Sequence, residues 1–428
     1  MAIAGGADFV ECDVQLTADL QMVCRHEQNL NETTDALDRF PDRVRTHTID
    51  GEESTGVHAI DLSLAELRTL RARQRFPFRD QSHNDRYPLV TFHEFLDLVE
   101  RAPRVVGVYP ETKHPTWHNA LPQLRAANTT IQELVVSALH ARGYGLGAHG
   151  SPEWRARPVF VQSFEMGSIR DMAAATRMPL VLLLGGWPGY RAPDSGMTHE
   201  EMTSPAALAE AARYVVGAGP WKGSLFTTVE DDVLPATDGS SSSSSSDSDS
   251  SSSSSSSSDS SSSIESSGGS DSGRSSTQSS SSEQGLSADA AHDMSLSAAA
   301  TAAGGARLVS TGLVARLKAA GLQVHPYTLR DEPRFVPGPL GGDVGCELAL
   351  LFAAEGVDGI FADYPATAAA WLRARRGAVG EGDVEAGVRR REGGEGVQGA
   401  RPKAPAAGLP WSAALSSLVG LLPSLRVA

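Results

Sequence analysis

The sequence predicts an α/β fold built around a parallel β-barrel. Short β-rich runs recur along the chain with helical stretches between them, which is the pattern of βα units and a parallel sheet. Polar side chains stand at the carboxyl ends of three apolar runs, where barrel enzymes hold their catalytic groups. The 428 residues, 40% of them hydrophobic, are enough for such a core, because one barrel uses about 250 residues.

The predicted strands are short and mostly apolar. Val159–Val161 and Leu180–Leu184 contain no polar residue, as expected of parallel strands covered on both faces. Seven runs qualify as strands, one fewer than a closed eight-stranded barrel needs. They are Ala7–Val14, Gln21–His26, Val105–Tyr109, Val159–Gln162, Leu180–Leu184, Gln323–Thr328 and Gly359–Asp363.

Helix boundaries support the same division of the chain. Ser63 with Glu66, and Thr91 with Glu94, have the spacing of a capping box in front of apolar helical stretches. Near the carboxyl end, an apolar stripe from Leu313 stops at Gly321, directly before a predicted strand. These helix boundaries support the same division of the chain into helices and strands.

Two polar segments divide the chain outside this pattern. Residues 239–285 are almost pure serine with scattered acids, and we expect a disordered insertion within a barrel domain of residues 1–375. Residues 376–428 read as a low-complexity linker followed by a weakly apolar tail. The unbroken part of the tail, Trp411 to Leu422, is too short to span a bilayer, so a surface helix is favoured over a membrane contact.

Charge and cysteine content narrow the function classes. A formal net charge of −15 argues against nucleic acid as a partner, since phosphate backbones are held by clustered Lys and Arg. Cys12, Cys24 and Cys346 are too few for a disulfide framework or a zinc cluster, and we expect Cys12 and Cys24 to pack as small hydrophobes in strands. No targeting segment is visible, so the compartment is left open.

Acidic residues interrupt the first strand. Phe9, Glu11 and Asp13 share one face of that strand, because side chains alternate between faces. Glu111 ends another strand on the same rim and could supply a third oxygen ligand to a hard cation. A pair such as Glu-x-Asp is more often a solvated strand edge, but buried carboxylates that converge usually hold a cation.

His26 and Lys113 follow the ends of two strands near these acids. Histidine titrates near neutrality and suits proton transfer, although an isolated histidine at a strand end can equally be structural. Lys113 could contact an anionic substrate group or simply balance Glu111. A metal, a lysine and a histidine together favour a phosphate ester over a neutral substrate.

The ordered series of segments resembles the glycerophosphodiester phosphodiesterase family, in particular its plant and bacterial-periplasmic branch. The resemblance covers roughly the first 370 residues apart from the serine insertion. It rests on Gly6–Thr17, Arg25–Glu27, Thr33–Asp35, Leu67–Arg73, Tyr109–Pro115, Val161–Glu165, Gly219–Lys222, His325–Thr328 and Gly356–Pro365.

This resemblance implies a TIM (β/α)8-type barrel that hydrolyses glycerophosphodiesters to glycerol 3-phosphate and an alcohol. It implies a divalent cation, Mg²⁺ or Ca²⁺, and a small-molecule glycerophosphodiester as substrate. The residues that it assigns are the metal ligands Glu11, Asp13 and Glu111, the acid/base His26, and the substrate contacts Lys113, Gln162 and Tyr327.

The sequence departs from the family at its start. The family begins with a strand ending in His-Arg-Gly and a helix carrying Glu-Asn-Thr, and neither precedes the strand at Ala7. We therefore expect a barrel that lacks its first strand and most of its first helix, and a chain with little or no activity as given. The alternatives are a non-catalytic phosphodiester-binding or interaction protein on the same fold, and a lipid phosphodiesterase acting on lysophospholipids.

Overall fold

The computed structural model describes residues 1–230 and 306–375, and its main feature is a seven-stranded sheet in the order β11-β8-β7-β6-β5-β1-β2. Neighbouring strands run parallel except for β2, which is antiparallel to β1. The α/β-barrel class is thereby confirmed. The strands are β1 (Phe9–Leu16), β2 (Met22–Cys24), β5 (Gly107–Thr112), β6 (Val161–Ser163), β7 (Leu180–Leu184), β8 (Gly217–Pro220) and β11 (Gln323–Val324).

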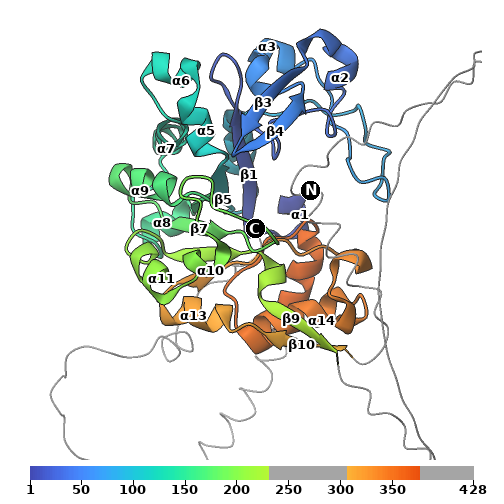
Figure 1. Ribbon diagram of the computed structural model, residues 1–428, viewed down its shortest axis with the longest axis vertical. Coiled ribbons are helices and arrows are strands. Elements are labelled where there is room, and N and C mark those ends of the chain that lie inside the picture. Colours follow the sequence, from blue (N-terminus) through green and yellow to red (C-terminus); the bar gives the residue numbers. More distant parts are fainter. Residues whose placement is uncertain (231–305, 376–428) are drawn as a thin grey trace, which may run out of the picture.

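Helices cover the outer side of this sheet (Figure 1). α4 packs on β1 and β2, α7 on β5, α9 on β6 and β7, and α13 on β11. The helices are α1 (Ala2–Gly5), α2 (Ala36–Arg39), α3 (Leu64–Leu67), α4 (Phe92–Glu100), α5 (Pro115–Ala120), α6 (Pro122–Ala127), α7 (Ile131–Ala141), α8 (Pro152–Ala156), α9 (Met166–Ala175), α10 (His199–Met202), α11 (Pro205–Ala211), α13 (Leu313–Ala319) and α14 (Val344–Ala349), with residues 365–375 also helical. Shorter helical turns are η1 (Pro41–Arg43), η2 (Ala59–Asp61), η3 (Lys222–Ser224), η5 (Pro333–Phe335), η6 (Gly338–Leu340) and η7 (Leu350–Glu355).

The helix boundaries inferred from the sequence are present. Ser63 and Glu66 form a capping box at α3, and Thr91 and Glu94 form one at α4. Gly321 follows α13 with a φ of 80°, a left-handed conformation that glycine adopts without a steric penalty. Local signals were therefore sufficient to place these ends.

The predicted barrel strand Gln21–His26 is wrong. Only Met22–Cys24 is a strand, and it folds back on β1 with Val14 opposite Cys24. A parallel partner needs a crossover of a dozen or more residues, whereas only five residues, 17–21, separate β1 from β2. The run is therefore the second arm of a hairpin, and it places His26 just beyond the end of β2, beside the middle of β1, where Arg25 N donates to Asp13 O at 2.9 Å.

The strand β8 (Gly217–Pro220) was missed by the sequence analysis. Its residues have no β-branched or aromatic side chain, so propensity does not identify it. The strand is completely buried between β7 and β11, and glycine permits that closeness. A Cβ on Gly219 would lie 2.6 Å from Leu183 Cδ2. Close packing against the neighbouring strands, rather than β propensity, therefore explains the glycines of β8.

The segment predicted as a strand at Gly359–Asp363 runs beside residues 324–329. Leu329 N donates to Phe361 O at 2.8 Å, and Asp363 N donates to Leu329 O at 3.0 Å. At the other end of the sheet, β1 pairs with β5 over Phe9–Val14 but with β2 only over Val14–Leu16.

Residues between β2 and α4 form a separate layer with its own small core. Leu30, Val57, Leu62 and Leu67 are fully buried in this core. Above them lies an antiparallel hairpin of β3 (Arg45–Ile49) and β4 (Glu52–Gly56), beside α2 and α3 in Figure 1. The 3-10 helix η2 follows this hairpin and contacts β1.

Cys12 and Cys24 form a disulfide with Cα atoms 5.3 Å apart, which overturns the expectation that they pack as free cysteines. Their spacing is explained by the hairpin, because Cys24 lies opposite Val14, two residues from Cys12. The sequence analysis had placed the two cysteines in separate barrel strands and so missed the pairing. Cys12 stands between Glu11 and Asp13, so the disulfide ties the acidic part of β1 to β2.

A further antiparallel pair, β9 (Phe226–Glu230) and β10 (Ala306–Ser310), places Glu230 opposite Ala306. The predicted serine-rich insertion 239–285 and the linker and tail 376–428 lie outside the described residues. Within the described residues, no helix combines the length and the hydropathy needed to cross a membrane.

Candidate active site

Three carboxylates meet at the carboxyl ends of β1 and β5. Asp13 is the register partner of Glu111, and Glu11 lies two residues back on the same face of β1. Their ligand oxygens all lie within 4.8 Å of one another. We call Glu11, Asp13 and Glu111 the rim cluster. The strand pairing brings them together as the sequence analysis expected.

The rim cluster is electrostatically strained. Burial, together with repulsion from Asp13 and Glu111, raises the pKa of Glu11 well above its usual value. Burial also raises the pKa of Glu111 to about 8, against the opposing effect of Lys113. Glu11 Oε1 is buried without a hydrogen-bond partner. Buried carboxylates in this state are stabilised by a cation.

Lys113 supplies part of that positive charge. Its Nζ lies 3.4 Å from Glu111 Oε1 and 3.6 Å from Asp13 Oδ1. Although burial opposes the shift, Lys113 and then His26 lower the pKa of Asp13. One ammonium group faces three carboxylates, so Lys113 alone does not balance the negative charge of the ionised rim cluster. A divalent cation would supply the remaining positive charge.

His26 stands next to Lys113, with its Nε2 3.2 Å from Lys113 Nζ. Its Nδ1 lies 2.8 Å from Glu27 Oε1, and its backbone oxygen accepts from Gln15 Nε2 at 3.0 Å. Arg75 Nη1 in turn pairs with Glu27 at 3.2 Å. The imidazole side chain remains 43% exposed, so it is held in place yet accessible.

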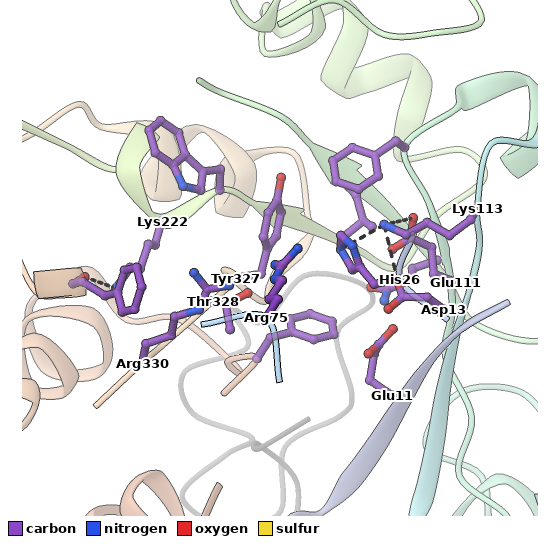
Figure 2. Close-up of a pocket in the computed structure, with 16 residues that line it drawn as sticks. Glu11, Asp13, His26, Arg75, Glu111, Lys113, Lys222, Tyr327, Thr328 and Arg330 are labelled. Carbon is purple, nitrogen blue, oxygen red and sulfur yellow. Dashed lines mark hydrogen bonds and ion pairs between the residues drawn. The ribbon is translucent and has the colours of Figure 1, made fainter. Parts of the chain in front are cut away.

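A single pocket contains every site residue that the sequence analysis named (Figure 2). The rim cluster, His26 and Lys113 occupy one side of it, and Gln162 and Tyr327 also line it. Gln162 is the register partner of Glu111 on β6, and its Oε1 is buried without a hydrogen-bond partner. Tyr327 OH donates to Leu184 O at 3.2 Å.

The opposite side of the pocket is basic and was missed by the sequence analysis. Arg75, Lys222 and Arg330 lie there, and the aromatic Trp221 and Phe335 are also among the residues that line the pocket. Lys222 follows β8, and its Nζ pairs with the buried Glu347 at 2.8 Å. The segment Gly219–Lys222 was noted for its resemblance, so its position after a strand could have identified Lys222. Nothing in the sequence around Arg75 indicates its place.

The rim cluster fits a hard divalent cation. It offers only oxygen ligands, one of them without a partner, and Mg²⁺ and Ca²⁺ prefer carboxylates completed by water or substrate oxygens. The pocket therefore combines a cation site, a histidine and basic groups. Such a combination suits an anionic phosphate ester.

The sequence is similar to those of known proteins. Residues 1–222 and 272–367 match the model of the Glycerophosphoryl diester phosphodiesterase family. The chain is 31% identical to glycerophosphodiester phosphodiesterase GDPD6 of Arabidopsis thaliana over 366 residues, which are 85% of this chain and 77% of the plant protein. It is 25% identical to the glycerophosphodiester phosphodiesterase of Haemophilus influenzae over 248 residues, or 51% of this chain and 62% of the relative.

Solved structures give weaker likenesses. A phosphodiesterase of Oleispira antarctica, in complex with the product sn-glycerol-3-phosphate, is 14% identical with a TM-score of 0.42, covering 87% of each chain. The glycerophosphodiester phosphodiesterase of Thermotoga maritima is 12% identical with a TM-score of 0.36, covering 86% of each chain. On the family match and the plant relative, the chain belongs to the glycerophosphoryl diester phosphodiesterase family, a family of phosphoric diester hydrolases.

Proposed function

We propose that the pocket bounded by the rim cluster is where this chain carries out the family's reaction. That reaction is the divalent-metal-dependent hydrolysis of glycerophosphodiesters to glycerol 3-phosphate and an alcohol. The observation that carries the proposal is the convergence of three carboxylates, a lysine and an accessible histidine in one pocket. The assignment of roles follows from their contacts.

Glu11, Asp13 and Glu111 would hold the cation, either Mg²⁺ or Ca²⁺. The partnerless Glu11 Oε1 and the strained Glu111 gain most from it, since a cation favours their ionised forms. When bound, such a cation withdraws charge from the phosphoryl oxygens of the substrate. Lys113, already beside the rim cluster, then faces the same phosphate.

His26 is placed to move a proton. With its Nδ1 hydrogen donated to Glu27, its Nε2 carries the lone pair and faces Lys113 in the pocket. Nε2 can therefore accept a proton from an attacking hydroxyl and return it to the leaving alcohol. Glu27 keeps a negative charge for this purpose, because His26 lowers its pKa although burial opposes that shift.

Gln162 and Tyr327 would orient the substrate between the acidic and basic sides. Gln162 Oε1, buried without a partner, can accept from a glycerol hydroxyl, while Arg75 and Arg330 extend a positive surface along the substrate. A phosphodiester anion placed here meets positive charge from both sides.

A second candidate function is phosphodiester binding without turnover. Among the described residues, His26 is the only histidine that lines the pocket, and reversible proton transfer to both the nucleophile and the leaving group commonly uses two groups. The described pocket would then recognise a phosphodiester through the cation and the basic side. Both functions share the same metal site, so turnover distinguishes them.

The test is release of glycerol 3-phosphate from glycerophosphocholine by the full chain. Activity that requires Mg²⁺ or Ca²⁺, is lost with EDTA and recovers when the cation is restored would support hydrolysis and would overturn the expectation that this chain has little or no activity. His26→Gln should lower kcat about 100-fold or more with a much smaller change in KM, whereas His93→Gln on the exposed face of α4 serves as the matched control.

Two outcomes decide between the functions. Cation-dependent binding of glycerophosphocholine, measured by calorimetry, without product release would favour the binding protein. No cation affinity in the full chain, or equal turnover by the His26 and His93 variants, would overturn the proposed roles.

A further inference from the structure

A second group of metal-ligating side chains lies outside the active-site pocket. His47 on β3, His58 after β4 and Asp61 at the end of η2 each offer one ligand atom, and these atoms lie within 4.8 Å of one another. We call them the hairpin cluster. None of the three lines the active-site pocket, so the reaction does not explain their convergence.

His58 is the informative member of the hairpin cluster. It is completely buried, and its Nε2 lies 2.9 Å from Ser54 Oγ. Its Nδ1 has no hydrogen-bond partner and lies 3.7 Å from Asp61 Oδ2, which is too long for a hydrogen bond. If Nδ1 carries the proton, this donor is unsatisfied. If Nε2 carries it, a lone pair faces a carboxylate, and a cation between them resolves the conflict.

His47 approaches the same carboxylate oxygen from the other side. Its Nε2 lies 2.8 Å from Asp61 Oδ2, and the two imidazole rings are 4.6 Å apart in a T-shaped arrangement. The side chains of His47 and Asp61 are 23% and 21% exposed, so an ion can enter from solvent and retain a water. Burial, then the neighbouring His47, lowers the pKa of His58 to about 4, so its imidazole is neutral as metal binding requires.

We propose that the hairpin cluster binds a zinc ion through His47 Nε2, His58 Nδ1 and Asp61 Oδ2, with water in the fourth position. Zinc takes imidazole and carboxylate ligands at about 2.0–2.2 Å, so neighbouring tetrahedral ligand atoms lie about 3.3 Å apart. His47 Nε2 lies 2.8 Å from Asp61 Oδ2, and His58 Nδ1 lies 3.7 Å from the same oxygen, so one distance is shorter and the other longer than that spacing. Mg²⁺ and Ca²⁺ prefer oxygen ligands and fit the rim cluster instead.

Neighbouring groups already hold His58 and Asp61 in place. Ser54 holds the other nitrogen of His58, and Asn29 Nδ2 donates to Ser54 Oγ at 3.3 Å. Arg43 donates to the backbone oxygen of Asp61 at 2.6 Å and fixes η2 against the preceding segment. Outer contacts of this kind orient metal-ligating histidines. The zinc would therefore clamp the β3–β4 hairpin to η2 over the small core.

The proposal is tested by measuring metal binding in a variant that lacks one ligand of the rim cluster. The full chain carrying Glu111→Gln is stripped with chelator and titrated with Co²⁺, a spectroscopic substitute for zinc. We expect one equivalent to bind with the strong visible absorption of a tetrahedral nitrogen and oxygen site, and Zn²⁺ to displace it.

The matched variants are His47→Gln, which changes a half-buried ligand, and His83→Gln, which changes an exposed histidine in the same part of the chain. His47→Gln should weaken Co²⁺ binding at least 100-fold and remove the rise in melting temperature caused by Zn²⁺. His83→Gln should do neither. Because His58 is completely buried and its replacement would disturb the small core, Asp61→Asn provides the second ligand variant, and its metal-free unfolding curve establishes that it is folded.

The proposal is overturned if the Glu111→Gln protein binds no Co²⁺, because all affinity then belongs to the rim cluster. It is also overturned if the His47 and His83 variants bind equally. Both measurements are independent of phosphodiesterase activity.

Discussion

The rim cluster and the hairpin cluster each gather three ligand groups within 4.8 Å, yet they differ in ligand chemistry. The rim cluster consists of carboxylates only, and burial raises the pKa values of Glu11 and Glu111. The hairpin cluster has one carboxylate and two imidazoles, and burial lowers the pKa of His58. Desolvation disfavours the charged form in both places, but it leaves protonated acids in one and neutral bases in the other.

This difference underlies the two proposals, a catalytic site at the rim cluster and a structural site at the hairpin cluster. A set of carboxylates strained by mutual repulsion lies open to the pocket, where a cation and a phosphate can complete it. Two imidazoles and one carboxylate lie at the β3–β4 hairpin, outside the pocket, where a cation would hold backbone segments together. The same number of ligands therefore supports two different uses, and variants can separate them.

The largest effect should come from the rim cluster. Glu111→Gln removes a metal ligand and is expected to lower glycerol 3-phosphate release about 1,000-fold, because the cation stabilises charge in the transition state. The matched control is Glu165→Gln, another buried carboxylate, which accepts from Thr116 N and Oγ1 and does not line the pocket. Its activity should change less than about threefold. Equal losses in the two variants would contradict the rim assignment.

The next effect concerns the disulfide under the rim cluster. Replacing Cys12 and Cys24 by Ala opens a link across 12 residues and should lower the free energy of unfolding by roughly 3 kcal/mol. Because Cys12 lies between Glu11 and Asp13, Mg²⁺ or Ca²⁺ affinity should fall as well. Urea denaturation and calorimetry measure the two effects.

Zinc binding by the hairpin cluster is the control measurement for the variant in which Cys12 and Cys24 are replaced by Ala. It should be unchanged, because the contacts that position His58 and Asp61 come from Ser54 and Arg43 and not from the disulfide. If zinc binding falls as much as Mg²⁺ binding, the two clusters are not independent. A free Cys346 in both proteins keeps the thiol background matched.

The rim cluster could be predicted from the sequence, and the hairpin cluster could not. Glu11 and Asp13 share a face of one strand, and Glu111 ends the next, so period-two alternation and the rule for parallel strands were sufficient. His47 and His58 come from a hairpin and the segment before η2. Their approach depends on a turn and on packing over the small core, which no periodicity records.

The fold was predicted where local patterns decide it. The parallel class and the capped helices followed from such patterns, and all seven proposed site residues line one pocket. The errors came from tertiary packing and connection length. β8 is a strand only because its neighbours enclose Gly217 and Gly219, and β2 runs antiparallel because its connection is short. The Cys12–Cys24 disulfide was missed for the same reason as β2.

The smallest expected effect is at the link between the two clusters. His118 is completely buried, and its Nδ1 donates to Lys113 O at 2.8 Å while its Nε2 accepts from Gln28 Nε2 at 3.0 Å. Gln28 Oε1 accepts from Ile60 N in η2 at 3.0 Å. This neutral histidine therefore connects the residue beside the rim cluster to the helix that carries Asp61.

Acid should weaken that link, since burial, then His114, lowers the pKa of His118 to about 3, below the 6.5 of an unfolded chain. Between these values the unfolded state binds more protons, so the stability that His118 contributes is complete above pH 6.5 and is lost as pH falls toward 3. The loss between pH 7 and pH 5 should be about 2 kcal/mol in urea denaturation of the metal-free chain. His118→Gln should flatten this dependence, and the exposed His93→Gln should preserve it. An unchanged slope in the His118 variant would mean that other groups carry the acid sensitivity and that the two clusters are joined elsewhere.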